Sequence, residues 1–433
     1  MINYRNAIDK EITLSGFAEK IRNLQWVQFI VLRNEGQRIQ ITIEKSEEKN
    51  ADMVKIVDTL TCESTIKVTG VIKENDHVKM GGIELIPNSI EVTSISEPEL
   101  PINIFDKSAA NIDTRMDNRF LDLRNDVNFY INKIQSEFVK GMRQYLYEND
   151  FTEIHTPKLI AAASESGSEV FEVNYFDNKA YLAQSPQFYK QMAIAAGYEK
   201  IFEVAPVFRA ENSNTNRHAT EFTGFDVELA NINSYEDVMS AEEDLLIAGL
   251  TAVKEKYGDK IKELYGQEVI IPTKPFPRIK LQDLYKELEK RYGYEIPSGD
   301  VGDMNAETEK LTSKFAMEEY GHEFIFVTDF SKTKRAFYHM RKDDIPQGYD
   351  LIWKGTEITT GAQREHRYDV LEKQAKEKGL GDDIKFYKDF FKYGCPPHGG
   401  FGIGVDRMTM LLLGLPSIKE TQFLFRGPNR LTP

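Results

Sequence analysis

The stretch IFEVAPVFRAENSNTNRHATEFTGFDVEL, residues Ile201–Leu229, consists of two β-rich runs that are joined by a long polar segment. The two runs, Ile201–Phe208 and Glu221–Leu229, predict strands, and the polar residues between them predict a hairpin loop. Two strands joined by a hairpin lie antiparallel in one sheet. The stretch therefore predicts an antiparallel sheet in the second part of the chain.

Further strand-like runs lie on both sides of this hairpin and alternate with helical stretches. We expect strands at Phe151–Thr156, Ala180–Ala183, Phe324–Thr328, Ala336–Met340, Tyr349–Trp353, Glu357–Thr359 and Gly400–Val405. We expect helices near residues 235–257 and 305–320, and a long amphipathic helix that begins at Val127. Strands linked by hairpins, with helices packed outside them, indicate an α+β domain over residues 127–433.

The first hundred residues have a different pattern. Five short β-rich runs lie between Ile12 and Val92 and are separated by glycine, asparagine and charged turns, which predicts a small β-barrel of the OB type. Ala51–Leu60 predicts the helix that such barrels carry between their third and fourth strands. Two prolines in Glu97–Pro101 mark a boundary. We therefore expect an OB-fold domain over residues 1–103 and a connector over 104–126.

Composition excludes several classes of protein. The chain has 433 residues and no run of roughly 18 apolar residues, which a membrane helix needs, and its start contains no apolar signal segment, so we expect a soluble, cytoplasmic protein. Cys62 and Cys395 predict neither a disulfide framework nor a zinc pair. The net charge of −14 counts against a protein that binds nucleic acid without regard to sequence. Any contact with RNA is therefore expected to be local.

The polar hairpin loop Phe208–Phe222 has the residue types that a nucleotide site requires. Arg209 can present a planar pair of donors to a phosphate or carboxylate, Arg217 and His218 can meet further phosphates, and Phe222 can stack on a purine. A short motif of this kind in isolation is more often a solvated hairpin.

A second candidate element is GGFGIGVDRMTMLLL, Gly399–Leu413. Its alternate glycines, at 400, 402 and 404, leave one face of a strand bare so that a flat ligand can lie against the backbone. Arg407 then lies at the start of an apolar helix, which is an end that attracts phosphate. Too few residues follow for a dinucleotide-binding βαβ unit. The alternative is that the glycines serve close packing alone.

A third candidate element is DLIWKGTEITTGAQREHR, Asp350–Arg367. Glu357 and Thr360, together with Asp350, can supply hard oxygen ligands to a magnesium ion that bridges ATP phosphates. Arg364, if buried, is suited to bidentate capture of a carboxylate, whereas an exposed arginine is usually solvated surface.

These segments together resemble the signature motifs of class II aminoacyl-tRNA synthetases. The subgroup that they resemble is the archaeal and eukaryotic type of aspartyl-tRNA synthetase, and the further segments that carry this resemblance are AYLAQSPQFYKQM (Ala180–Met192), GCPPHGGFGIG (Gly394–Gly404) and DTRMDNRFLDLR (Asp113–Arg124). The match runs in the same order along nearly the whole chain, barrel included. It implies ATP-dependent ligation of L-aspartate to tRNA(Asp) through an aspartyl-adenylate. Charging of tRNA(Asn) stays open, because Glu19 matches neither residue common at its position in the family.

The resemblance also implies roles for individual residues. Lys190 and Arg364 would hold the side-chain carboxylate of aspartate, Arg209 its α-carboxylate and the α-phosphate of ATP, and Gln187 and Glu165 its α-amino group. Arg209 and Arg407 would act in catalysis. The residues implied for ATP are Arg209, Glu211, Arg217, His218, Phe222, Glu357 and Arg407, and those implied for Mg²⁺ are Glu357 and Thr360.

For the barrel, the resemblance implies that Phe29, Gln40 and Glu84 contact anticodon bases, although Phe29 could instead be a core residue. The helix from Val127 resembles the dimer interface of class II enzymes, so a homodimer is expected, although a long amphipathic helix is more often packed in the core of its own chain. Two alternatives stay open. One is an asparaginyl-tRNA synthetase with the same fold, and the other is a catalytically silent relative that binds tRNA or a protein partner.

Overall fold

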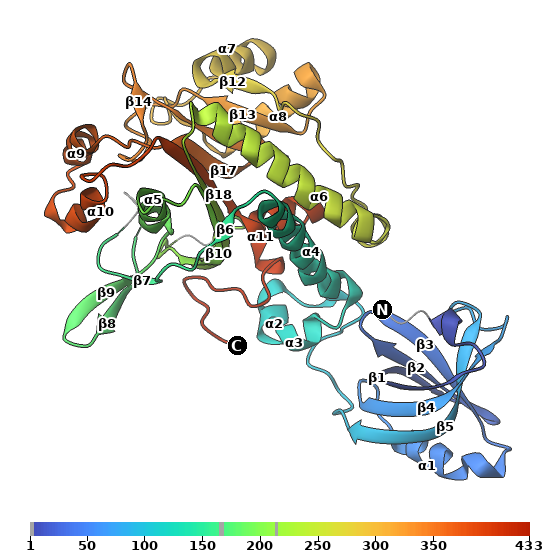
Figure 1. Ribbon diagram of the computed structural model, residues 1–433. Coiled ribbons are helices and arrows are strands. Elements are labelled where there is room, and N and C mark those ends of the chain that lie inside the picture. The colour runs from blue at the N-terminus through green and yellow to red at the C-terminus, as the bar shows by residue number, and fades with distance from the viewer. Residues whose placement is uncertain (1–3, 164–168, 213–214) are drawn as a thin grey trace. The chain divides into compact units, whose positions relative to one another are not determined.

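The chain divides into two compact units, Met1–Phe129 and Tyr130–Pro433, and each is described by itself. The structure, a computed structural model, describes residues 4–163, 169–212 and 215–433 (Figure 1). Within these residues, no helix combines the length and the apolar character needed to cross a membrane. The expected boundaries at residues 103 and 126 both lie inside the first unit and stay predictions.

The first unit contains a closed five-stranded barrel, as the sequence predicts. Its order is β1 (Glu11–Asn23), β2 (Val27–Asn34), β3 (Gln37–Glu44), β5 (Ile83–Ser94) and β4 (Thr65–Glu74). Alternate residues of each strand point inward, and the core includes Ile30, Leu32 and Ile41. The expected helix is α1 (Ala51–Thr59). The remaining short helices of this unit are η1 (Tyr4–Ala7), η2 (Glu48–Asn50), η3 (Lys107–Ala109), α2 (Ile112–Asp117) and α3 (Arg119–Asp122).

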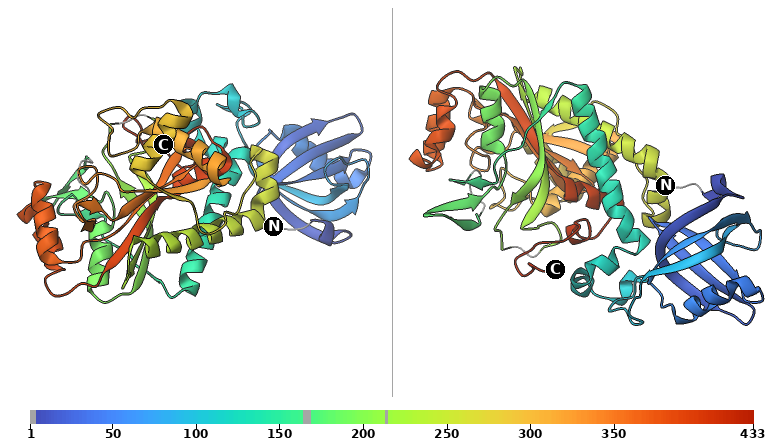
Figure 2. Two further views of the ribbon diagram at one scale, coloured as in Figure 1. Left: turned by 90° about the horizontal axis from the view of Figure 1, so that it is seen from above. Right: turned by 60° about the horizontal axis from the view of Figure 1, so that its bottom comes forward.

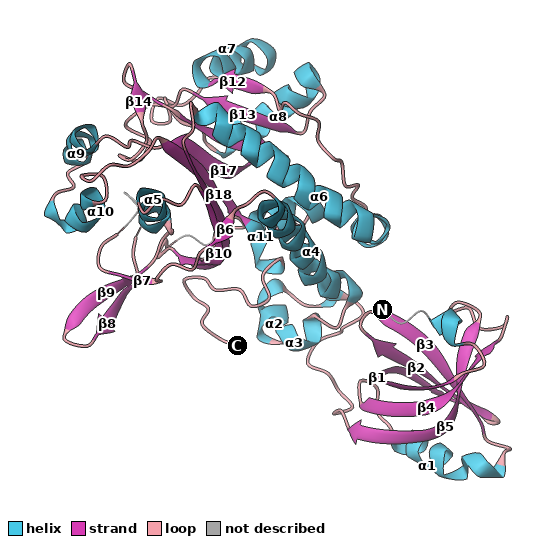
Figure 3. Cartoon of the chain, viewed as in Figure 1, coloured by secondary structure: helices cyan, strands magenta, loops and turns pink. Residues whose placement is uncertain are grey.

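The second unit is built on an eight-stranded sheet (Figure 3). Its order is β12 (Arg278–Lys280), β13 (Phe324–Thr328), β16 (Gly348–Trp353), β17 (Thr356–Gln363), β18 (His398–Gly404), β11 (Glu221–Ala230), β10 (Lys200–Phe208) and β6 (Thr152–Glu153). Neighbours are antiparallel except the outer pairs β12–β13 and β10–β6. Two small sheets are β7 (Leu159–Ile160), β9 (Asn178–Leu182) and β8 (Glu172–Tyr175), and β14 (Arg341–Lys342) with β15 (Ile345–Pro346). This α+β architecture confirms the predicted fold class.

Helices cover both faces of the large sheet (Figure 2). They are α4 (Asp126–Glu148), α5 (Gln187–Ala195), α6 (Tyr235–Tyr265), α7 (Leu281–Tyr292), α8 (Ala306–Tyr320), α9 (Tyr368–Glu377), η4 (Asp382–Ile384), α10 (Lys385–Asp389), α11 (Val405–Leu413) and η5 (Ile418–Glu420). Helices α4 and α6 pack closely because Gly141 faces Ala252 and Gly249 faces Phe138, where a Cβ atom would lie within 3.0 Å of its neighbour. The opposite face of the sheet is left for α5 and the cavity described below.

The structure corrects three sequence predictions. Ala336–Met340 is not a strand, because it forms turns whose carbonyls at Phe337 and His339 accept hydrogen bonds from the side chain of Gln374. The strand expected at Phe151–Thr156 is only two residues long. Helix α6 continues eight residues beyond the predicted end at 257, as far as Tyr265, and ends at Gly266, whose φ of 65° is left-handed.

Candidate functional site

A cavity of about 570 Å³ lies on the face of the large sheet opposite α6, in the second unit. It is lined by α5, β11, β17, β18, the β10–β11 loop and the start of α11. Eleven residues with a predicted role in binding aspartate, ATP or Mg²⁺ line it: Gln187, Lys190, Arg209, Glu211, Arg217, His218, Phe222, Glu357, Thr360, Arg364 and Arg407. Glu165 lies outside the described residues. Side chains that are up to 220 residues apart in the sequence are thus brought into one site.

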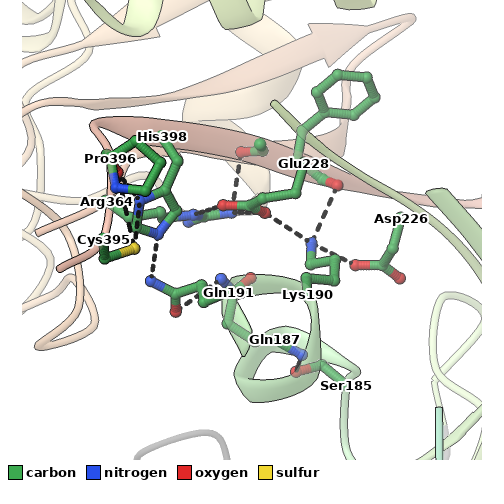
Figure 4. A network of polar contacts seen from close by, with 12 residues as sticks. Ser185, Gln187, Lys190, Gln191, Asp226, Glu228, Arg364, Cys395, Pro396 and His398 are labelled. Atoms are coloured by element: carbon green, nitrogen blue, oxygen red, sulfur yellow. Dashed lines mark hydrogen bonds and ion pairs between the residues drawn. The ribbon is translucent and has the colours of Figure 1, made fainter. Parts of the chain in front are cut away.

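Lys190 and Arg364 lie at one end of the cavity and share a carboxylate (Figure 4). Lys190 Nζ lies 2.8 Å from Asp226 Oδ1 and 3.4 Å from Glu228 Oε2. Arg364 Nε donates to Glu228 Oε1 at 2.9 Å, and its Nη2 donates to the carbonyl of Gly400 at 2.9 Å. Glu228 is fully buried. Burial alone would raise the pKa of Glu228, but the charges of Arg364 and Lys190 outweigh it and lower that pKa.

Sequence reasoning missed Asp226 and Glu228. It assigned Lys190 and Arg364 to the carboxylate of a substrate, whereas each already has a carboxylate partner within the protein. This end of the cavity therefore carries two positive and two negative side chains. The available signal was the spacing of two acids in FTGFDVEL, because residues two apart on a strand share a face.

The glycines of β18 serve two purposes. Gly400 and Gly402 lie directly opposite Glu228 and Asp226, and a Cβ atom on Gly400 would lie 2.3 Å from Glu228 Oε2. Gly400 thus makes room for the carboxylate of Glu228, whereas Gly402 also lines the cavity, so the predicted role of these glycines beside a flat ligand stays a prediction. At Gly404 the nearest atom to a Cβ would be 3.6 Å away, and this residue lines the cavity.

Cationic side chains at the other end of the cavity suit an anion. Arg209, on the β10–β11 loop, lies over the ring of Phe222 at 5.3 Å. The Nε of Arg209 is buried and has no hydrogen-bond partner among the described residues. A buried donor of this kind is free to bond to a ligand. Arg217 donates to Glu309 at 3.0 Å and to the carbonyl of Gly355 at 3.3 Å. Burial lowers the pKa of His218, so the ring is neutral at pH 7.

Oxygen ligands gather beside these cations. Thr360 Oγ1 lies 2.9 Å from Asp350 Oδ1 and 3.2 Å from Glu357 Oε1. Burial, and then the charge of Asp350, raise the pKa of Glu357 to about 7. Arg407 Nη1 donates to the carbonyl of Glu357 at 2.5 Å. In the described part of the chain, no three His, Cys, Asp or Glu side chains form a metal cage. The set instead matches Mg²⁺ held by one or two protein ligands together with substrate phosphates.

The residues predicted to bind anticodon bases lie together on the outer face of the barrel. Phe29 is half-buried and is not part of the barrel core. It pairs with Arg22 on β1 and Thr42 on β3, so the alternative that Phe29 is a core residue is wrong. Gln40 Nε2 donates to Thr42 Oγ1 at 3.2 Å and to Glu84 Oε2 at 3.4 Å. Glu84 is buried and also accepts a hydrogen bond from Asn75 at 2.7 Å.

Glu19 is not on this exposed surface. It is buried, and it accepts hydrogen bonds from Arg33 at 3.2 Å and from Arg38 at 2.8 Å. Its side chain is thus committed to an ion-pair network of the first unit, in which Arg33 also meets Glu63 at 2.7 Å.

The chain matches two families of known proteins. The family "tRNA synthetases class II (D, K and N)" matches residues 111–426, and the family "OB-fold nucleic acid binding domain" matches residues 12–93. The aspartate–tRNA(Asp) ligase of Pyrococcus furiosus is 38% identical, over 100% of this chain and 99% of the relative. The aspartate–tRNA(Asp/Asn) ligase of Aeropyrum pernix is 40% identical, over 98% of this chain and 95% of the relative.

Solved structures of similar proteins cover nearly the whole chain as well. An aspartyl-tRNA synthetase from Entamoeba histolytica has a TM-score of 0.87 and 33% identity, over 99% of this chain and 91% of its own. The asparaginyl-tRNA synthetase of Pyrococcus horikoshii, complexed with asparaginyl-adenylate, has a TM-score of 0.89 and 29% identity, over 99% of this chain and 97% of its own.

Changing Glu228→Gln should destabilise the second unit, because Lys190 and Arg364 would lose a shared buried counter-charge. We expect the free energy of unfolding to fall by about 3 kcal/mol. Urea unfolding followed by circular dichroism measures it. The control is Glu221→Gln, at the exposed end of the same strand, for which we expect a change within about 0.5 kcal/mol. Equal stability of the two variants would contradict the role given to Glu228.

Proposed function

The chain belongs to the class II tRNA synthetases of the D, K and N group, and we propose that it ligates L-aspartate to tRNA(Asp) through an aspartyl-adenylate made from ATP. One observation carries this proposal. Lys190 and Arg364, suited to a carboxylate, line the same cavity as Arg209 and Arg407, suited to phosphate. We further propose that the enzyme works in the cytoplasm, where tRNA is charged.

The fold does not separate aspartate from asparagine, because synthetases of both kinds have similar structures. The chemistry of the cavity favours aspartate. Lys190 and Arg364 carry only donors, and the two oxygens of a side-chain carboxylate are both acceptors. Asparagine would turn one acceptor into an NH₂ group, whose two donors would face donors. The curated relatives at about 40% identity, which are named as aspartate ligases, support the same choice.

Activation in this cavity needs no nucleophile from the protein. The α-carboxylate of aspartate attacks the α-phosphorus of ATP in line, the bond to the β-phosphate breaks, and pyrophosphate leaves. Arg209 holds the attacking carboxylate and the α-phosphate together and offsets their charge. Phe222 stacks on the adenine, Glu211 accepts from the adenine edge, and Arg217, His218 and Arg407 surround the outer phosphates. The terminal ribose hydroxyl of tRNA then attacks the adenylate carbonyl, and AMP leaves.

Glu357 and Thr360 would hold the Mg²⁺ ion that accompanies ATP. The residues present fit this ion, because Thr360 lies within hydrogen-bond distance of both the buried carboxylate of Asp350 and the half-buried carboxylate of Glu357. Burial, and then the charge of Asp350, raise the pKa of Glu357, and a cation bound there would offset both effects. The bound ion would neutralise phosphate charge as pyrophosphate forms. Gln187, and Glu165 outside the described residues, would bind the α-amino group of aspartate.

Changing Lys190→Met should abolish most activation of aspartate while ATP still binds, because the side-chain carboxylate loses a buried cationic donor. We expect the KM for aspartate in ATP–pyrophosphate exchange to rise by about 100-fold. Lys286→Met, which changes an exposed lysine on α7, is the matched control and should leave exchange unchanged.

The same exchange assay on the unmodified protein tests the function itself. We expect exchange with aspartate and not with asparagine. Exchange with asparagine alone would instead identify an asparaginyl enzyme, and no exchange with either amino acid would support a silent relative that only binds tRNA or a protein.

We propose that Phe29, Gln40 and Glu84 read the anticodon by stacking and by contacts to base edges. Gln40→Ala should raise the KM for tRNA(Asp) about tenfold, as expected for one or two lost hydrogen bonds, and leave exchange unchanged. Thr69→Ala, on the outer face of β4, is the control. Equal losses in charging and exchange would contradict the proposal that the barrel residues act on tRNA binding and not on adenylate formation. Side-by-side charging of tRNA(Asp) and tRNA(Asn) measures the tRNA range, which differs among the relatives.

We propose that the enzyme is a twofold homodimer that forms along α4. An open groove of about 850 Å³ on this helix supports the proposal, and its lining includes Gln135, Val139, Arg143 and Tyr147. Sedimentation should give the mass of a dimer. Val139→Asp should give a monomer, whereas Glu255→Lys, on the exposed side of α6, should not. A monomeric unmodified protein would refute the proposal.

A further inference from the structure

A chain of buried polar contacts leads from Gln187, at the cavity, to a backbone carbonyl behind it (Figure 4). Gln187 Nε2 lies 3.1 Å from Gln191 Oε1, and Gln191 Nε2 lies 2.9 Å from His398 Nε2. His398 Nδ1 lies 2.8 Å from the carbonyl oxygen of Pro396. Gln191 and His398 are completely buried, so their polar atoms must find hydrogen-bond partners within the protein. Only one direction of donation along these contacts gives every donor an acceptor.

The carbonyl of Pro396 decides that orientation, because a carbonyl oxygen only accepts. The proton of the imidazole must therefore be on Nδ1 of His398. Burial lowers the pKa of His398 to about 4, so the ring is neutral and its Nε2 is an acceptor. The NH₂ group of Gln191 must then face His398, and its Oε1 must face the opposite way.

The same logic fixes the amide of Gln187. Oε1 of Gln191 accepts from Gln187 Nε2, and it also accepts from the hydroxyl of Tyr387 at 2.8 Å. Since the NH₂ group of Gln187 is thus turned inward, Oε1 is the atom that the amide presents to the cavity. An oxygen acceptor suits an ammonium group, whereas an NH₂ group at the same place would oppose it.

We propose that Gln191 and His398 are positioning residues that hold the carbonyl oxygen of Gln187 toward the α-ammonium group of aspartate. The inference rests on the proposed function for the identity of the ligand, but the direction of the hydrogen bonds follows from the contacts alone. Neither residue lines the cavity. Both act through Gln187, at a distance from the substrate.

The residues around this chain of contacts are mostly aromatic. The ring of Tyr387 stacks on Phe188 with centroids 4.2 Å apart, and His398 stacks on Phe391 with centroids 6.1 Å apart. Cys395 Sγ lies 3.7 Å from His398 Nδ1, and burial raises the pKa of this thiol to about 12, so it stays protonated. Glu228 and Arg364 act on His398 in opposite directions, the first raising and the second lowering its pKa. The neutral Nδ1–H form is therefore the one that fits.

Two variants of Gln191 test the proposal through aspartate binding. Gln191→Met removes the acceptor for Gln187, and we expect the KM for aspartate in pyrophosphate exchange to rise about three- to tenfold. Gln191→Glu keeps that acceptor and should restore the KM to within about twofold of the unmodified protein, with His398 becoming protonated beside the new carboxylate. Equal KM values for the two variants, or no rise in either, would overturn the proposal.

Succinate, which is aspartate without its α-amino group, separates positioning from a general loss of structure. In Gln191→Met the affinity for aspartate should fall while the inhibition constant of succinate stays the same. A parallel loss for both ligands would mean that Gln191 only supports the fold.

A spectroscopic measurement tests the direction of the chain without any assay. In protein with ¹⁵N-labelled histidine, the resonances absent from His398→Gln identify His398, and we expect the Nδ1–H tautomer with an unprotonated Nε2 at pH 7. An Nε2–H tautomer, or a doubly protonated ring, would refute the inference. Exchange with aspartate in the unmodified protein is measured separately, so failure of the proposed function is distinguishable from failure of this inference.

Discussion

The buried contact of Glu228 with Lys190 and Arg364 is the interaction on which the cavity depends. A carboxylate without solvent exposure stays ionised only when nearby positive charge offsets the cost of burial. Here that charge comes from Lys190 on α5 and from Arg364, the residue that follows β17, while Glu228 itself is on β11. Three elements are therefore tied together at the point where the substrate side chain would bind, and the donors are ordered before any ligand arrives.

The register of the sheet places the two ends of the cavity relative to each other. Asp350 on β16 is opposite Thr360 on β17, Thr360 is opposite Gly402 on β18, and Gly402 is opposite Asp226 on β11. Neighbouring strands lie about 4.8 Å apart, so this row spans about 14 Å from the oxygen ligands to the partner of Lys190. Because Gly402 has no side chain, nothing projects from the middle of this row into the cavity, and one substrate can extend from one end to the other.

Local patterns in the sequence predicted much of this arrangement. Alternating runs predicted most strands of the sheet, the hairpin with its arginines, and the barrel. The segment Ala336–Met340 was predicted wrongly because its carbonyls are bonded by Gln374, which lies in a later helix. Asp226 and Glu228 were missed for a related reason. Their spacing indicates that they share one face of a strand, but their partners are 36 and 136 residues away, and the spacing does not show which side chains they contact. The roles of the cavity residues came from resemblance, not from spacing.

The same device operates in both units. A glutamine side chain alone has no preferred direction, because its oxygen and NH₂ ends differ little in size. At Gln40, the buried carboxylate of Glu84 accepts a hydrogen bond from the NH₂ end of the amide. At Gln187, the carbonyl of Pro396 has the same effect indirectly, through His398 and Gln191. A chain with a net charge of −14 does not attract RNA through its overall charge. With the contacts proposed for Gln40 and Gln187, buried acceptors that orient these two amides would supply selectivity that overall charge does not.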